Sequence, residues 1–302
     1  MTKDSIKKEF IQKIERHNQI HFDINGTFCQ FYDFDENKGA YNWSDSLETI
    51  HNESIVSAHP VDHFERELVL AYTDKFLFRE KPPVICDFGC STGFMLQALK
   101  NRIAGKAVFI GVDAVGSGLR KLHVKEPEML LFKFDIAKIP FPENVLDVVI
   151  CLNVLEHIED DITVLREFER VLKPGGVACI VVPYGDKLYD YYDESCMHVR
   201  RYGRNELLDK LRNAGFSIIR HSFLSCLLYI PFYIKKKINR TIWKKGISDV
   251  NKMTMMQNDI KATKDNILIR SLFALDNELS KRFSLPFGIR EVVLVQKTTA
   301  IF

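Results

Sequence analysis

Short apolar runs alternate with amphipathic stretches along most of this chain. The runs predict strands buried on both faces of a sheet, and the stretches between them place apolar residues at helical spacing. The predicted strands are residues 84–86, 107–112, 129–134, 146–151, 177–182, 216–223 and 289–296, and the clearest helices are 61–78 and 204–214. Strands that alternate with helices in this way indicate an α/β protein with a doubly wound sheet.

Two parts of the chain depart from the alternation. Near the start, Ile6, Phe10 and Ile14 predict a helix, and the aromatic, irregular stretch after it suits either a lid or a segment packed on the surface. A long segment also separates the last two predicted strands. We therefore expect three parts: an extension or lid at 1–60, a central domain at 61–225 and 288–302, and a helical insertion at 226–287.

The insertion begins with an apolar, aromatic run at 223–234, followed by Lys235, Lys236 and Lys237 and further basic residues up to 245 without an acid among them. The run is shorter than the roughly 20 residues that span a bilayer. It suits either a segment in a membrane interface or a core or homodimer helix whose charged end is solvated.

Composition narrows the class of protein. Of the 302 residues, 46% are hydrophobic and 27% are charged, and the net charge is +2, so we expect a sizeable core and no general attraction to nucleic acid. The first residues show no apolar signal segment, which favours a cytoplasmic protein. The seven cysteines have no paired C-x-x-C spacing. Since nothing completes a site around Cys86 and Cys90, we expect no metal.

The stretch from Val84 to Phe94 is a strand, a glycine loop and the start of a helix. Gly89 and Gly93 permit a tight turn and a close approach of the backbone to a ligand. This order places backbone N–H groups at the carboxyl edge of the sheet, where open α/β sheets bind ligands. Asp87 at the strand tip would repel a pyrophosphate but suits an ammonium or sulfonium ligand. The alternative is a loop that only turns the chain.

A second acid follows the next strand. Asp113 lies roughly 20 residues beyond the loop, the separation at which a carboxylate can meet ribose hydroxyls. It could instead only cap the helix that opens near Ser117. The loop spacing Asp-x-Gly-x-x-x-Gly is not the Gly-x-Gly-x-x-Gly of nicotinamide enzymes, which argues against an oxidoreductase.

The glycine loop resembles the first motif of class I S-adenosylmethionine (SAM) dependent methyltransferases. Ser91 stands where a further Gly is common, a departure of little consequence if Ser91 keeps an ordinary φ. The segment 141–183 also resembles that family, including Leu155-Glu156-His157-Ile158 and Lys173-Pro174-Gly175-Gly176. The resemblance implies a Rossmann-like, mostly parallel seven-stranded sheet whose last strand returns antiparallel, and SAM as cofactor.

The resemblance also implies which residues hold the cofactor. The expected SAM contacts follow the first, second, third and fourth strands: Asp87, Gly89, Cys90, Gly93, Asp113, Ala114, Asp135, Ile136 and Asn153. Among them, Asp135 and Ile136 would border the adenine, because family members commonly have an acid at this strand end. A surface turn is the alternative for Asp135.

The acceptor side is expected after the fifth strand. There His198 has a near-neutral ordinary pKa that suits a general base, and Arg200 and Arg201 could pair with an acidic acceptor. Family members with small-molecule, lipid or sugar acceptors have a similar His-x-Arg-x-Tyr-like element, here ending at Tyr202. Alternatively His198 only caps its loop and the arginines bond backbone carbonyls. For His157 we expect mainly a role in orienting its helix.

These observations favour a SAM-dependent methyltransferase that moves a methyl group to a small-molecule, sugar or lipid-linked acceptor, most readily at oxygen. The alternative is a SAM-binding or membrane-surface protein without turnover. The expected location is cytoplasmic, with membrane-surface contact through 223–245 or a homodimer contact as the two interpretations of the insertion.

Overall fold

The computed structural model describes residues 2–18, 28–30, 60–78, 80–244, 246, 252, 254, 255, 258 and 266–298. The strands are β1 (Phe28–Gln30), β2 (Val84–Phe88), β3 (Val108–Asp113), β4 (Leu130–Lys133), β5 (Leu146–Leu152), β6 (Leu172–Pro183), β7 (Phe216–Leu224) and β8 (Arg290–Lys297). The helices are α1 (Lys3–Asn18), α3 (Pro60–Leu77), α4 (Phe94–Arg102), α5 (Gly116–Lys125), α6 (Asp161–Val171), α7 (Tyr191–Ser195), α8 (Glu206–Asn213), α9 (Tyr229–Lys244) and α11 (Ile267–Arg282). Two short 3₁₀ helices are η1 (Leu155–His157) and η2 (Asp186–Leu188).

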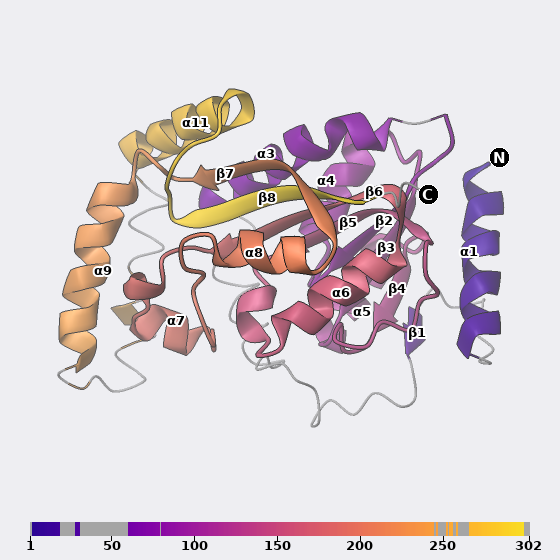
Figure 1. The fold of residues 1–302 in the computed structure, drawn as a ribbon, viewed down its shortest axis with the longest axis horizontal. Helices are drawn as coiled ribbons and strands as arrows, with labels where there is room; N and C mark the ends of the chain where they lie inside the picture. The colour runs from indigo at the N-terminus through magenta and orange to yellow at the C-terminus, as the bar shows by residue number, and fades with distance from the viewer. Residues whose placement is uncertain are drawn as a thin grey trace.

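All described strands join one sheet with the order β1-β4-β3-β2-β5-β6-β8-β7 (Figure 1). The pairs from β1 to β6 are parallel, and β8 runs antiparallel between β6 and β7. The predicted mostly parallel sheet with a returning last strand is therefore confirmed, and β1 adds a short edge strand beside β4. The order reverses at β2, so the gap between the β2–α4 and β5–η1 connections is where such sheets bind ligands.

Helices cover both faces of the sheet because its central strands are apolar on both sides. One face packs on α1, α6 and α8 through residues such as Phe10, Phe168 and Leu211, and the other packs on α3, α4 and α5. Every residue of β2 and β3 is buried. Cys86, Cys151 and Cys179 lie inside these strands as buried free thiols.

The apolar run at residues 223–234 is divided between two elements. Phe223 and Leu224 end β7, and α9 begins only at Tyr229. Asp276 of α11 causes the break, because its carboxylate accepts hydrogen bonds from the backbone of Ser225 at 2.6 Å and of Leu227 at 2.9 Å. A buried carboxylate that holds two backbone N–H groups fixes a turn where apolarity alone suggests continuity.

The rest of the insertion is tied to the domain through α11. The Tyr72 hydroxyl on α3 donates to the Ser280 carbonyl at 3.0 Å, and Arg220 of β7 donates to the Ser280 and Lys281 carbonyls. No helix within the described ranges is long and apolar enough to cross a membrane. Most of residues 1–60 and of 247–265 lie outside the described residues, so the expected lid stays a prediction.

Candidate active site

A cavity of about 420 Å³ opens where the parallel strands end. Its wall includes Asp87 in β2 and Gly89 just after it, Asp113 at the end of β3, Asn153 after β5 and Pro183 at the end of β6. This is the carboxyl edge of the sheet at the reversal of strand order. The volume lies within the usual range for small-molecule and cofactor sites.

The glycine loop is held in shape by β3. The N–H groups of Gly89 and Cys90 donate to the Val112 carbonyl at 2.8 and 3.0 Å, and the Ser91 N–H donates to the Asp113 carboxylate at 2.8 Å. Gly89 has φ 80°, and a Cβ there would overlap Val154. The condition on Ser91 is not met, because its φ is 46°, in the left-handed region that favours glycine.

Two acids at the cofactor end lie buried together. Burial, and then the neighbouring charge of Asp113, raises the pKa of Asp87 to about 8. Burial also raises the pKa of Asp113, although the Val115 and Ser91 N–H groups oppose this. Two buried carboxyls that disfavour each other's ionisation favour a cationic ligand between them. The site therefore fits a ligand with a sulfonium and an ammonium group.

The other expected cofactor residues fall into two groups. Ala114, Asp135, Ile136, Cys90 and Asn153 line the same cavity. Gly93 is not among the described lining residues: it has φ 79°, precedes α4, and leaves no room for a Cβ beside Leu122. The glycine therefore allows the turn and the packing of α4 against α5.

The side chain of Asn153 has a partner of its own. Its amide donates to Glu65 of α3 at 2.9 Å. Asp135 likewise accepts from the Ala137 N–H at 2.9 Å, so part of its capacity serves the turn after β4. Both residues keep positions on the cavity wall while these bonds fix their orientation.

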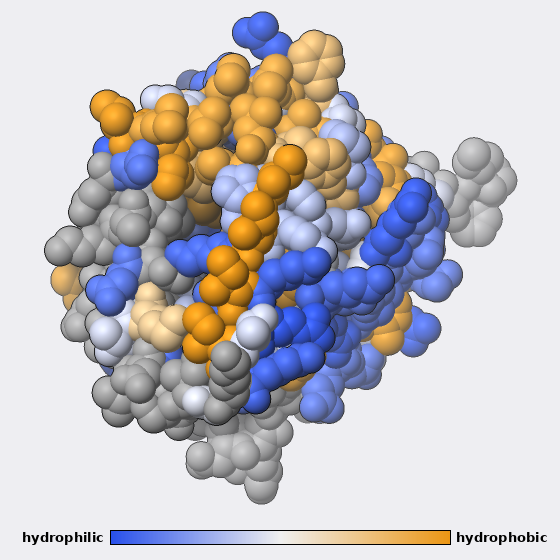
Figure 2. Space-filling view, turned by 90° about the vertical axis from the view of Figure 1, so that its left-hand side faces the viewer, coloured by the Kyte–Doolittle hydropathy of each residue, from blue (hydrophilic) through white to orange (hydrophobic). Residues whose placement is uncertain are grey.

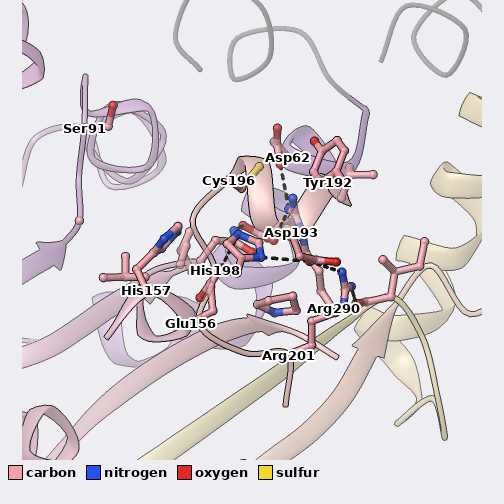
Figure 3. Close-up of a pocket in the computed structure, with 18 of the residues that line it drawn as sticks. Asp62, Ser91, Glu156, His157, Tyr192, Asp193, Cys196, His198, Arg201 and Arg290 are labelled. Carbon is pink, nitrogen blue, oxygen red and sulfur yellow. Dashed lines mark hydrogen bonds and ion pairs between the residues drawn. The ribbon is translucent and has the colours of Figure 1, made fainter. Parts of the chain in front are cut away.

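His198 lies at the other end of the cavity, across from Ser91 in Figure 3. Its Nδ1 is 3.0 Å from Asp193 Oδ1, and its Nε2 is 3.9 Å from Glu156 Oε1. Arg201 donates to the same Asp193 oxygen at 2.7 Å, and Lys236 of α9 donates to the other at 2.9 Å. His198 is thus oriented by a buried carboxylate that two cations hold in place.

The electrostatics assign protonation states to this group. Burial lowers the pKa of His198, although Asp193 opposes this, so the imidazole is neutral at pH 7. Burial works against the charge of Asp193, but Arg201, His198 and Lys236 together hold its pKa well below the usual range. Because an ionised carboxylate only accepts, Nδ1 of His198 carries the proton and the lone pair is on Nε2.

Glu156 is an unusual member of the wall. It is fully buried, neither of its carboxyl oxygens has a hydrogen-bond partner among the described residues, and burial raises its pKa to about 8. Glu156, His157 and His198 each offer one ligand atom, and within the described ranges these atoms lie within 4.8 Å of one another. Among the described residues these three side chains could hold a metal ion, and the prediction of no metal stays untested.

Two of the three expected acceptor residues face elsewhere. Arg200 donates to Asp161 at 2.9 Å and to the Glu159 carbonyl at 2.7 Å, and the Tyr202 hydroxyl donates to Asp161 at 2.6 Å. The buried Asp161 draws both side chains to the start of α6, away from the cavity. Only Arg201 of this set lines the cavity.

The sequence did not point to several residues of the wall. Asp193 is the third helical residue of α7 and its side chain accepts from the Asp190 N–H, a capping-box spacing that signals a helix start rather than a site. Arg290 donates to Asp62 at 2.8 Å and to Glu65 at 2.6 Å across most of the chain length. Further lining residues come from the insertion: Phe232, Lys235, Lys236, Asn239 and Phe273.

Comparisons with known proteins find methyltransferase domains among the relatives of this chain. A methyltransferase domain family matches residues 86–180. A probable S-adenosylmethionine-dependent methyltransferase of Mycolicibacterium smegmatis is 26% identical over 136 residues, which is 44% of this chain and 52% of the relative. The human mitochondrial arginine-hydroxylase NDUFAF5 is 30% identical over 108 residues, 36% of this chain and 31% of that protein.

The fold is also found among solved structures. A Haemonchus contortus phosphoethanolamine N-methyltransferase 2 in complex with S-adenosyl-L-methionine matches with a TM-score of 0.55 at 15% identity, covering 84% of this chain and 56% of that one. Fold and site thus define a Rossmann-like domain for a cationic nucleoside cofactor. Residues 86–180 match a methyltransferase domain, and the relatives include probable S-adenosylmethionine-dependent methyltransferases, which supports a domain of the class I SAM-dependent methyltransferase type with SAM as its cofactor. It spans about half or less of the length of these curated relatives.

The buried acids predict an unusual pH dependence of stability without ligand. Asp87 and Glu156 have pKa values of about 8, against ordinary values of 3.8 and 4.5, so between about pH 4 and 8 the folded state binds more protons than the unfolded chain. Their stabilising contribution to the free energy of unfolding is fully present below pH 4 and is lost as the pH rises through 8. We expect Glu156→Gln to reduce this loss by a few kcal/mol, since one unit of pKa shift is worth about 1.4 kcal/mol.

Chemical denaturation of the ligand-free wild type and of Glu156→Gln at pH 5, 6, 7 and 8 measures this difference. An exposed acid on α8, changed in Asp209→Asn, is the matched control and should leave the pH dependence unaltered. Parallel curves for wild type and Glu156→Gln would mean that Glu156 is ionised in the folded protein.

Proposed function

We propose that this protein is a methyltransferase that moves the methyl group of SAM to a hydroxyl oxygen of a small-molecule, sugar or lipid-linked acceptor. One observation carries the proposal: the pair of His198 and Asp193 lies in the same cavity as the cofactor acids Asp87 and Asp113. The cavity therefore combines a site for a cationic cofactor with a neutral, oriented base.

SAM supplies an electrophilic methyl group on sulfur. The part of the protein is to align the acceptor oxygen with that methyl group and to take up the proton. Holding the two reactants in line in a closed cavity is worth up to about 7–11 kcal/mol of the barrier. Water is kept from the reacting atoms where the wall is apolar, at Val154, Ile158 and Phe232.

His198 is the group that accepts the proton. Its Nδ1–H donates to Asp193, which leaves the lone pair on Nε2, 3.9 Å from Oε1 of Glu156 on the cavity wall. When Nε2 takes the acceptor proton, the imidazolium is stabilised by the ionised Asp193 at 3.0 Å. Arg201 and Lys236 keep Asp193 from being protonated in its place, so the proton stays on His198.

There is also a competing function, because the human relative named above is called an arginine-hydroxylase and matches the same domain at 30% identity. The domain therefore occurs in a protein named for an activity other than methyl transfer. The competing proposal is a SAM-binding protein without methyl transfer, and the experiment has to separate the two.

The test incubates the protein with methyl-labelled SAM and an extract of its source cells, and measures S-adenosylhomocysteine and labelled product. A methyltransferase forms both in equal amounts, and His198→Ala forms far less of each. SAM binding by calorimetry without S-adenosylhomocysteine formation in any extract fraction would favour the binding protein. A labelled product that carries the methyl group on nitrogen or carbon would contradict the choice of oxygen.

A further inference from the structure

Helix α9 presents a row of isoleucines to the surroundings. Ile230, Ile234, Ile238 and Ile242 recur every four residues, and they are 68%, 54%, 55% and 37% exposed. Residues four apart on a helix share one face. Figure 2, which faces the side of the molecule where α9 lies, shows an apolar row with strongly hydrophilic surface beside it.

The polarity of α9 is inverted relative to an ordinary surface helix. Its fully buried residues are Lys236 and Asn239, while its isoleucines point outward. An amphipathic helix in water normally turns its apolar side to the core. Two buried ion pairs fix this orientation of the helix, because Lys236 binds Asp190 at 2.6 Å and Asp193 at 2.9 Å.

A second anchor fixes the rotation of the helix near its end. The Trp243 ring N–H donates to Glu194 at 3.0 Å, and Arg240 donates to the Lys187 carbonyl at 2.8 Å. Turning α9 to hide its isoleucines would break these bonds and the buried ion pairs of Lys236. The bonds of α9 to the domain therefore keep the isoleucine row exposed.

A basic row runs beside the isoleucines. Lys237, Arg240 and Lys244 are exposed and recur at spacings of three and four residues, so they lie on one side of α9. The helix sequence from Tyr229 to Lys244 contains five basic residues and no acid. An apolar row next to a purely basic row is the pattern of a helix that lies in the interface of an anionic bilayer.

We propose that α9 docks this protein on the surface of a bilayer that contains anionic lipid, with the isoleucine row in the acyl boundary and the basic row on the headgroups. Two copies packed through the same face would bring their basic rows together, whereas an anionic surface complements them. Since α9 is too short and too polar to cross the bilayer, the protein lies on the surface.

Docking also bears on the acceptor. Phe232, Lys235, Lys236 and Asn239 of α9 line the cavity, so the helix that meets the lipid is also a wall of the site. An acceptor that resides in the bilayer, with an apolar tail and a hydroxyl-bearing headgroup, could reach His198 along this wall. This second step rests on the proposed methyl transfer, whereas the docking itself does not.

The experiment is flotation of the full chain with two kinds of vesicle, phosphatidylcholine alone and phosphatidylcholine with about 30% phosphatidylglycerol, in the absence of SAM and acceptor. We expect binding to the anionic vesicles. The combined change Ile230→Ser, Ile234→Ser and Ile238→Ser should lower the partition coefficient by about tenfold or more. The matched control is Phe78→Ser with Val124→Ser, two apolar residues that are 60% and 83% exposed away from α9.

A second pair of variants tests the basic row. Lys237→Ala with Lys244→Ala should weaken binding to anionic vesicles by roughly tenfold or more, and Lys121→Ala with Lys125→Ala on α5 is the control of equal charge. Unchanged flotation of the isoleucine and lysine variants, or no flotation of the wild type, would overturn the proposal. So would a wild-type dimer in sedimentation that the isoleucine variant converts to a monomer without any lipid binding.

The readouts separate the two proposals. If the α9 substitutions abolish flotation but no acceptor is methylated, membrane docking is supported and the proposed methyl transfer is refuted. If a water-soluble acceptor is methylated and the wild type does not float with vesicles, methyl transfer is supported and membrane docking is refuted. Circular dichroism of each variant shows whether a loss of binding reflects the surface or the fold.

Discussion

Changing His198 to Ala is expected to lower the turnover number about 10²- to 10⁴-fold, the usual contribution of a positioned general base. The affinity for SAM should change little, because His198 lies at the end of the cavity opposite the cofactor loop (Figure 3). Turnover with the methylated acceptor and calorimetric SAM binding measure the two effects separately. A loss of SAM affinity as large as the loss of turnover would mean that His198 shapes the cofactor site.

The pH profile gives the same assignment a second test. Wild-type turnover should fall at low pH as His198 becomes protonated, with a midpoint below its ordinary value because burial lowers its pKa. His198→Ala should lack this limb. Asp193→Asn removes the negative charge and offers an amide NH2 that can donate to Nδ1 and favour the other tautomer, so it should also lower turnover. His157→Ala should keep the limb although the two rings are only 4.9 Å apart.

The sequence predicted the sheet well because its strands are buried on both faces. Strands such as β2 and β5 are nearly continuous apolar runs, so their position follows from composition alone, and their ends differ from the predicted ones by a residue or two. The insertion shows the limit of this reasoning. Phe223 and Tyr229 belong to one apolar run, and the turn between them is held by Asp276, which lies far along the chain.

The two ends of the site differ in how predictable they are. The cofactor end could be predicted because Asp87 and Asp113 lie near the carboxyl ends of neighbouring parallel strands, which meet at one edge of the sheet. The acceptor end depends on pairs that are distant in sequence, such as Asp193 with Lys236 and Glu65 with Arg290. Arg200 and Tyr202 were misplaced for the same reason, since nothing near them in the sequence shows that Asp161 will bind both.

The affinity for SAM should rise about 30-fold between pH 5.5 and 7.0, a range in which the ligand keeps its own ammonium group. The reason is the buried Asp87, whose pKa of about 8 leaves it protonated in the ligand-free protein at neutral pH. A sulfonium or ammonium group in the cavity favours the carboxylate, so binding releases a proton, and the dissociation constant falls as the pH rises toward the pKa. Calorimetry at several pH values measures the affinity, and repeating it in buffers of different ionisation enthalpy counts the proton released.

Asp87→Asn separates this effect from other titrations, because an amide has nearly the same shape and cannot ionise. Its affinity should be low and nearly independent of pH over the same range, while Glu156→Gln, which removes the other cavity acid with a pKa of about 8, should keep most of the wild-type dependence. Glu156 lies 3.9 Å from His198, whereas Asp87 lies in β2 just before the glycine loop, so Asp87 should respond more strongly to the charge of the cofactor. If Asp87→Asn still bound SAM more tightly at higher pH, with one proton released, the titrating group would have to be Asp113, whose pKa burial also raises. The number of protons released on SAM binding distinguishes a buried acid that ionises on binding from one that is already a carboxylate in the ligand-free site.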